Sequence, residues 1–132
     1  MLHLRLPSVL QSIRALEPSV SGLPEWGGLS ESKRHDVLLC MMEIVTNAIT
    51  HGNGLDTGRM VDVSIDITLS EIVIVVADQG GGFDAASLPD PTSEGRRDLD
   101  GGRGIHTVRT LADDVTFSRS ESGHFVTIRF HR

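Results

Sequence analysis

The sequence predicts an α+β fold, a two-layer sandwich in which a mixed, mostly antiparallel sheet is covered on one face by about three helices. Segments that alternate apolar and polar residues come in pairs joined by short turns, which is typical of antiparallel hairpins. The helical patterns are too few to cover both faces of such a sheet. A chain of 132 residues is also the size of one domain with its own core. We therefore expect residues 1–132 to form a single domain.

The first thirty residues are expected to contain a strand, a helix and a loop. Leucines alternate with other residues over residues 2–6, which predicts a short half-buried strand. Ser8 is placed to cap a helix that ends at Glu17-Pro18, because the residue before a proline disfavours the α conformation. Residues 18–29 are rich in proline, glycine and serine, so we expect a loop that is anchored in the core by Trp26.

The rest of the chain combines helices with hairpin strands. A helical pattern over residues 30–51 has apolar residues around most of its circumference, so this helix is expected to be largely buried. The segment 72–77 is apolar on both faces, which indicates a central strand. The other expected elements are a strand over 61–69, a helix that starts just after Gly104, and a hairpin over 115–119 and 125–130.

Composition and charge restrict the class of partner. The chain has 12 basic and 18 acidic residues and a formal charge of −6, which disfavours binding to nucleic acid. Its longest apolar run is far shorter than the roughly 20 residues of a membrane-spanning helix, and its first residues show no signal-peptide pattern. The single cysteine, Cys40, cannot form an internal disulfide. We expect a cytoplasmic protein with no membrane partner and no direct nucleic-acid partner.

A polar stripe interrupts the long buried helix. Glu43, Asn47 and His51 are four residues apart, so they lie on one side of the helix. A carboxylate is rarely buried without a partner, which indicates a cleft above the stripe. In such a cleft a carboxylate can take a proton from an attacking hydroxyl, and an asparagine oxygen can bind Mg²⁺. The stripe alone is explained equally well by a helix edge that meets solvent.

A glycine-rich segment follows the predicted central strand. Asp78 lies where this strand ends, and Gly80–Gly82 come two residues later. A carboxylate there suits an amino group such as that on an adenine edge, and glycines let the backbone approach a planar ligand. The alternative is an ordinary Asp-Gly turn, although three consecutive glycines cost more chain entropy than such a turn requires.

A second glycine cluster, Gly101–Gly104, precedes the next predicted helix. Free N–H groups at a helix N-terminus form a site for phosphate. The polar residues about 85–104 have the composition of a mobile lid, from which Arg96, Arg97 and Arg103 could reach a phosphate. For Arg96 and Arg97 a solvated surface position is at least as good an interpretation.

The order of these segments resembles the histidine-kinase-like ATPase superfamily, which includes gyrase-type topoisomerases, chaperones of the ninety-kilodalton class and sensor kinases. Glu43–Gly52 resembles the N box of that superfamily, Asp78–Asp84 its G1 box and Gly101–Ile105 its G2 box. Gly123–Thr127 matches its final Gly-x-x-x-Thr box. The small size and the Gly-Phe-Asp ending of the G1 box are most similar to the anti-sigma-factor serine/threonine kinases of bacterial partner-switching systems.

The resemblance implies a Bergerat-type sandwich that binds Mg-ATP and assigns a role to each matched residue. Glu43 would be the catalytic base that polarises the serine of a protein substrate, and Asn47 would be the Mg²⁺ ligand. Asp78 would bind the adenine amino group, and Thr127 would assist through its hydroxyl and a water. The other residues expected to bind the nucleotide are His51, Gly80, Gly82, Phe83, Gly102, Arg103, Gly104 and Ile105.

Two features depart from the pattern of sensor kinases. The N box contains no lysine, and the chain has no pair of dimerisation helices with a phosphoacceptor histidine. The histidines outside the N box, His124 among them, are expected to be surface or packing residues.

The leading interpretation is a Mg-ATP-dependent serine/threonine kinase that binds a sigma factor, as an anti-sigma factor, and phosphorylates an anti-sigma-factor antagonist. The alternative is a non-catalytic nucleotide-binding switch module that regulates a partner such as a phosphatase. Glu43 favours catalysis, because a pure binding module needs no base there. A fragment of a larger sensor kinase is a third, weaker interpretation. A homodimer is expected by resemblance alone, with residues 18–29 as one candidate interface.

Overall fold

The computed structural model describes residues 1–80 and 100–132, and its described strands form one five-stranded sheet in the order β1-β2-β3-β5-β4. Every pairing between these strands is antiparallel, which confirms the predicted hairpins. The apolar strand β3 is the central one, as its sequence predicts. The strands are β1 (Leu2–Pro7), β2 (Met60–Ile67), β3 (Glu71–Ala77), β4 (Asp114–Ser120) and β5 (Gly123–His131).

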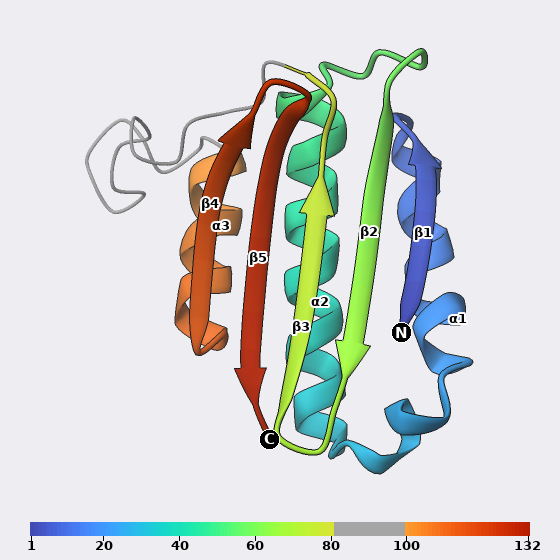
Figure 1. Cartoon of the computed structure of the whole chain (residues 1–132), viewed down its shortest axis with the longest axis vertical. Helices are drawn as coiled ribbons and strands as arrows, with labels where there is room; N and C mark the ends of the chain where they lie inside the picture. The colour runs from blue at the N-terminus through green and yellow to red at the C-terminus, as the bar shows by residue number, and fades with distance from the viewer. Residues whose placement is uncertain (81–99) are drawn as a thin grey trace.

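The helices lie together behind one face of the sheet, so the predicted two-layer α+β sandwich is confirmed (Figure 1). The long helix α2 lies behind the centre of the sheet, α1 lies near β1 and α3 lies behind β4. The described helical segments are the 3₁₀ helices η1 (Leu10–Ala15) and η2 (Pro24–Gly28), the α-helices α1 (Leu16–Ser21), α2 (Glu31–Asn47) and α3 (Asp100–Leu111), and the π-helical turn η3 (Ala48–Gly52).

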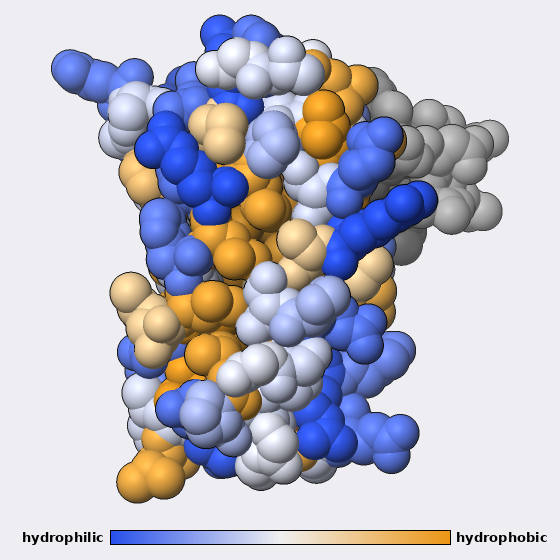
Figure 2. Space-filling view, turned by 90° about the vertical axis from the view of Figure 1, so that its right-hand side faces the viewer, coloured by the Kyte–Doolittle hydropathy of each residue, from blue (hydrophilic) through white to orange (hydrophobic). Residues whose placement is uncertain are grey.

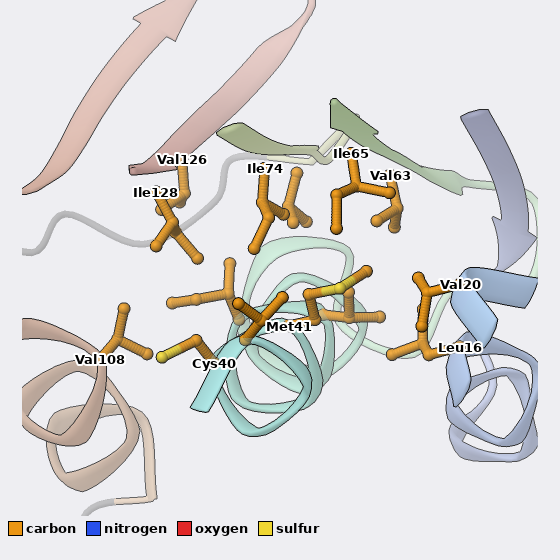
Figure 3. Close-up of a cluster of buried hydrophobic side chains, with 14 of the residues drawn as sticks. Leu16, Val20, Cys40, Met41, Val63, Ile65, Ile74, Val108, Val126 and Ile128 are labelled. Carbon is orange, nitrogen blue, oxygen red and sulfur yellow. The ribbon is translucent and has the colours of Figure 1, made fainter. Parts of the chain in front are cut away.

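The core fills the space between α2 and the sheet. Met41 and Cys40 project from α2, with Met41 below Ile74 and Cys40 between Val108 of α3 and Ile128 of β5 (Figure 3). All five side chains are fully buried. Burial, with help from nearby acidic groups, raises the pKa of the Cys40 thiol to about 12. Cys40 is therefore a small apolar core residue and not a reactive thiol.

Three expectations for the first thirty residues are wrong. Ser8 caps no helix: its hydroxyl is buried and donates a hydrogen bond to the Arg59 carbonyl oxygen at 2.6 Å. Pro18 does not end a helix but is the third residue of α1, where its missing N–H is one of the four that have no acceptor within a helix. Residues 18–29 are not one loop, because α1 continues to Ser21 and η2 covers Pro24–Gly28. The predicted anchor is confirmed, because Trp26 is buried in η2.

Two predicted helices have different ends in the structure. After Asn47 the long helix continues as a π turn, closed by a hydrogen bond of 2.7 Å from the Asn53 N–H to the Ala48 carbonyl oxygen. π turns of this kind are frequent at functional sites. The helix α3 begins at Asp100, so the second glycine cluster lies within its first turns and not before it. Packing of Gly104 against α2, described below, overrides the low helix propensity of glycine.

Asn53 joins four segments at the end of the sheet above η3. Its amide nitrogen donates hydrogen bonds to the Ser8 hydroxyl at 2.9 Å and to the Met60 carbonyl oxygen at 3.0 Å. Its side-chain oxygen accepts the N–H of Gln79 at 2.9 Å. Asn53 is fully buried, so these bonds hold the residue after Asp78 to the rest of the fold.

We expect Asn53→Ala to lower the free energy of unfolding by about 2–3 kcal/mol, because it leaves buried donors and acceptors without partners. Urea unfolding followed by circular dichroism measures the change. Thr57→Ala, at an exposed position in the same connection, is the control and should change stability by less than about 0.5 kcal/mol. Equal stability of the two variants would show that the Asn53 bonds do not hold this region together.

Candidate functional site

Asp78 is a buried carboxylate at the end of the central strand. Its Oδ1 accepts the backbone N–H of Gly80 at 3.1 Å and that of His124 at 3.4 Å. Its own N–H donates to the His124 carbonyl oxygen at 3.0 Å. Burial raises the pKa of Asp78, and the two backbone N–H groups act in the opposite direction. The result is an oriented hydrogen-bond acceptor, held by backbone groups of two segments.

Glycines from three segments make this position possible. A Cβ on Gly52 would lie 2.7 Å from the Asp78 Cγ, and one on Gly80 would overlap the Gly52 carbonyl group. Gly123 has φ +147° and lies against the backbone carbonyl of Asp78. A side chain at Gly52 would displace the carboxylate, and side chains at Gly80 or Gly123 would push apart the backbone segments that surround it, which gives a physical reason for glycine at these positions.

A cavity of about 150 Å³ opens beside Asp78. It is smaller than the roughly 300–1,000 Å³ of a typical small-molecule site, so it suits one part of a ligand, such as a ring. Its walls are mostly apolar, and its polar lining residues are Asp78, Ser118, Arg119 and His124. The described lining residues are Ile44, Ala48, Val76, Asp78, Phe117, Ser118, Arg119, His124, Phe125 and Val126.

Glu43 and Asn47 lie side by side on α2 and face Gly104 of α3. A Cβ on Gly104 would be 2.7 Å from the Glu43 Oε2 and 3.4 Å from the Asn47 Nδ2. Asn47 is only 3% exposed, and its Nδ2 has no hydrogen-bond partner in the part of the chain that the structure describes. The next residues along the helix, Ile44 and Ala48, line the Asp78 cavity. One helix therefore carries both the polar pair and a wall of the cavity.

The structure does not bring Thr127 to this site. Thr127 pairs with Val75, while its neighbour Val126 pairs with Val76 and faces the helices. Successive strand residues point to opposite faces of a sheet, so the Thr127 hydroxyl lies on the open face, away from the Asp78 carboxylate. The expectation that Thr127 assists Asp78 through a water is corrected accordingly.

The other expected site residues are distributed as follows. His51 is exposed at the end of the π turn, and Ile105 is buried in the core. Gly102 and Arg103 belong to the first turns of α3. Gly82, Phe83, Arg96, Arg97 and most of the expected lid, residues 85–99, lie outside the described residues.

His124 is the residue that sequence reasoning missed. Its side chain lines the cavity, and its Nδ1 lies 3.9 Å from the Asp78 Oδ1. The signal was present in the sequence, because His124 has the same strand parity as the buried residues Val126, Ile128 and Phe130. That parity places it on the helix side of β5.

Within residues 1–80 and 100–132, no group of three His, Cys, Asp or Glu side chains could hold a metal ion. A hard cation such as Mg²⁺ requires few protein ligands, because waters and phosphate oxygens complete its shell. The side-chain oxygens of Glu43 and Asn47 could serve as such protein ligands. The Asn47 amide is buried and its nitrogen has no partner among the described residues. No described helix combines the length and the apolar character that crossing a membrane requires.

The model of the histidine kinase-like ATPase domain family matches residues 6–130, and the chain belongs to this family. It is 29% identical to the serine-protein kinase RsbW of Staphylococcus epidermidis over 129 residues, which cover 92% of this chain and 80% of that protein.

Two solved structures share the fold over the whole chain. The RsbU and RsbW domains of Rv1364c from Mycobacterium tuberculosis match with a TM-score of 0.64 and 17% identity, over 99% of this chain and 32% of that chain. A SiaB–SiaC complex from Pseudomonas aeruginosa matches with a TM-score of 0.65 and 13% identity, over 100% of this chain and 90% of that chain. The chain thus spans about a third of the mycobacterial chain in that structure. At these identities the likeness is one of fold.

We expect Asp78→Asn to be more stable than the wild type at pH 7. The fold raises the pKa of Asp78 above its ordinary value of 3.8, so ionisation of this carboxyl opposes folding. The wild type therefore gains stability as the pH falls from the raised pKa towards 3.8, because the folded state binds the proton first. Asparagine carries no charge and keeps an oxygen for the two backbone N–H groups. The advantage of the variant should therefore shrink towards that pH, as measured by urea unfolding at a series of pH values. Asp66→Asn, on the open face of the sheet, is the control, and a pH-independent difference for Asp78→Asn would contradict the argument.

Proposed function

We propose that this chain is a Mg-ATP-dependent serine/threonine protein kinase that acts as an anti-sigma factor. The observation that carries the proposal is the arrangement around α2: a cavity closed by a buried carboxylate lies next to a second carboxylate paired with an asparagine. Membership of the histidine kinase-like ATPase domain family supports ATP as the ligand. The names of the relatives, serine-protein kinases, support serine as the acceptor.

The Asp78 cavity holds the adenine ring. Apolar side chains of Ile44, Ala48 and Val76 form walls for a flat ring, and the Asp78 carboxylate accepts the N–H of the exocyclic amino group. Gly52 leaves room for the carboxylate, and Gly80 lets its own backbone approach that of Gly52. Glu43 and Asn47, on the same helix as Ile44 and Ala48, would hold the phosphate end of the nucleotide.

Glu43 and Asn47 perform the chemistry of transfer. The Glu43 carboxylate accepts the proton of the substrate hydroxyl, and the Asn47 side-chain oxygen is a ligand for Mg²⁺. When bound, ATP would supply the phosphoryl group, with ADP as the leaving group, and Mg²⁺ would neutralise part of the negative charge on the phosphates. Phosphoryl transfer depends mainly on positioning and electrostatic stabilisation, and a carboxylate and an amide fixed one helical turn apart on a buried helix provide that positioning.

The protein substrate is an anti-sigma-factor antagonist, and the second protein partner is a sigma factor. A net charge of −6 is consistent with control of transcription through proteins and not through direct contact with nucleic acid. Such a kinase acts in the cytoplasm, where ATP, the sigma factor and the antagonist are present together.

Glu43→Gln should lower transfer of labelled phosphate from Mg-ATP to a serine of an antagonist protein by at least about 100-fold, because it removes the base and keeps the shape of the side chain. ADP affinity, measured by calorimetry, should change only a few-fold. Glu31→Gln, in the first turn of the same helix, is the matched control and should transfer phosphate at the wild-type rate.

Two outcomes would overturn parts of this proposal. Wild-type transfer by Glu43→Gln would remove Glu43 from the role of base. A wild-type protein that binds ADP but phosphorylates no antagonist would be the non-catalytic switch module instead.

The kinase is a homodimer in this proposal, and the side formed by β1, η1 and α1 is its interface. β1 pairs only with β2 among the described strands, so its other edge can pair with a second copy. Apolar side chains form a broken band down this side (Figure 2). Leu10 and Leu55 are each 50% exposed and line one groove there. Trp26, in the segment expected to form the interface, is buried within the chain.

Leu10→Glu should raise the dimer dissociation constant by at least about ten-fold, because it places a charge in an apolar interface. Sedimentation equilibrium measures the constant. Leu69→Glu is the control: Leu69 is 96% exposed in the turn that follows Ile67, where β2 ends. Equal dissociation constants for the two variants, or a monomeric wild type, would rule out this interface.

A further inference from the structure

His124 lies next to Asp78 with one ring nitrogen already bound and the other without a partner. The Nε of Arg119 is 2.9 Å from the His124 Nε2. The His124 Nδ1 is buried and has no hydrogen-bond partner within the described chain. The Asp78 Oδ1 lies 3.9 Å from this nitrogen, too far for a hydrogen bond.

Arg119 determines which nitrogen of the neutral ring carries the proton. An arginine N–H can only donate, so the His124 Nε2 must accept and cannot be protonated. The proton of the neutral imidazole is then on Nδ1. The cavity therefore contains a buried N–H donor beside a buried carboxylate acceptor, both held by contacts within the protein.

We propose that His124 is a specificity-determining residue of the nucleotide site, whose Nδ1–H donates a hydrogen bond to a ring nitrogen of adenine while Asp78 accepts from the adjacent amino group. The inference rests on the proposed function, because it takes the ligand of the cavity to be an adenine nucleotide. Adenine presents an amino donor next to a ring-nitrogen acceptor, and guanine presents a carbonyl acceptor at the place of that amino group. The donor and acceptor in the cavity match adenine and oppose guanine.

Because its Nδ1–H is unpaired, His124 should affect nucleotide affinity more than a residue that only packs against the base. A buried donor without a partner is costly, so a ligand atom that accepts from it recovers that cost. Sites that contain such groups reject analogues that lack the matching atom. Arg119 is a positioning residue in this scheme, since it acts through the ring of His124 and fixes the position of its proton.

The test uses ADP and its 1-deaza and 7-deaza analogues, in which one of the two ring nitrogens that flank the amino group is replaced by carbon. Calorimetry should show that the wild type binds one of the two analogues about ten-fold more weakly than ADP. His124→Leu should bind ADP about ten-fold more weakly than the wild type and should bind ADP and that analogue equally. His124→Asn should keep the discrimination, because its amide nitrogen is as many bonds from Cα as the Nδ1 it replaces.

Arg119→Leu tests the positioning role. It frees the imidazole proton to move to Nε2, so it should reduce the discrimination between ADP and the analogue without abolishing ADP binding. Thermal unfolding of each variant without ligand shows that it is folded.

The outcomes separate the two proposals. If the wild type binds no ADP, the proposed function fails and this inference fails with it. A different result is that the wild type binds ADP, but His124→Leu discriminates between ADP and each analogue to the same extent as the wild type. In that case the proposed function stands and His124 has no contact with the base.

Discussion

The burial of one carboxylate, Asp78, at the end of the central strand is the constraint on which the site depends. An ionised carboxylate loses hydration when it is buried, and here two backbone N–H groups compensate for part of that loss. Those N–H groups belong to the segment after β3 and to β5, and the glycines Gly52 and Gly123 allow the approach. The pKa of Asp78 is still raised. The ionised carboxylate is thus incompletely compensated, and a hydrogen-bond donor from a ligand would stabilise it. Carboxyl groups with a shifted pKa are common at functional sites.

The helix α2 connects this site to the core. Met41 and Val45 on one side of α2 are fully buried and Met41 packs beneath the sheet (Figure 3), while Glu43 and Asn47 on another side face Gly104 of α3. The same packing that stabilises the fold therefore fixes the direction of the polar pair. Asn53 extends this arrangement beyond the π turn, because its hydrogen bonds hold the backbone of Gln79, the residue after Asp78. Stability and site geometry share these contacts.

Much of the fold could be predicted because its signals are local. The alternation along β2 and the apolar run in β3 predict a half-buried strand and a central strand, and the structure has both. The errors come where distant contacts decide. Pro18 is a local exception, because the first turn of a helix accepts a proline. Elsewhere the hydroxyl of Ser8 bonds across the chain to Arg59, and Gly104, in the helical glycine cluster, lies against Glu43 and Asn47 of α2. None of these partners is close in sequence.

The sequence by itself determined the strands, the long helix and the polar residues Glu43, Asn47 and Asp78, because periodicity and residue chemistry are properties of short segments. Only the tertiary structure decided which side chains meet. The alternation along β5 places His124 and Thr127 on opposite faces of the sheet, but only the register of β5 against β3 puts His124 beside Asp78. That register pairs residues about fifty positions apart, beyond the reach of any local pattern.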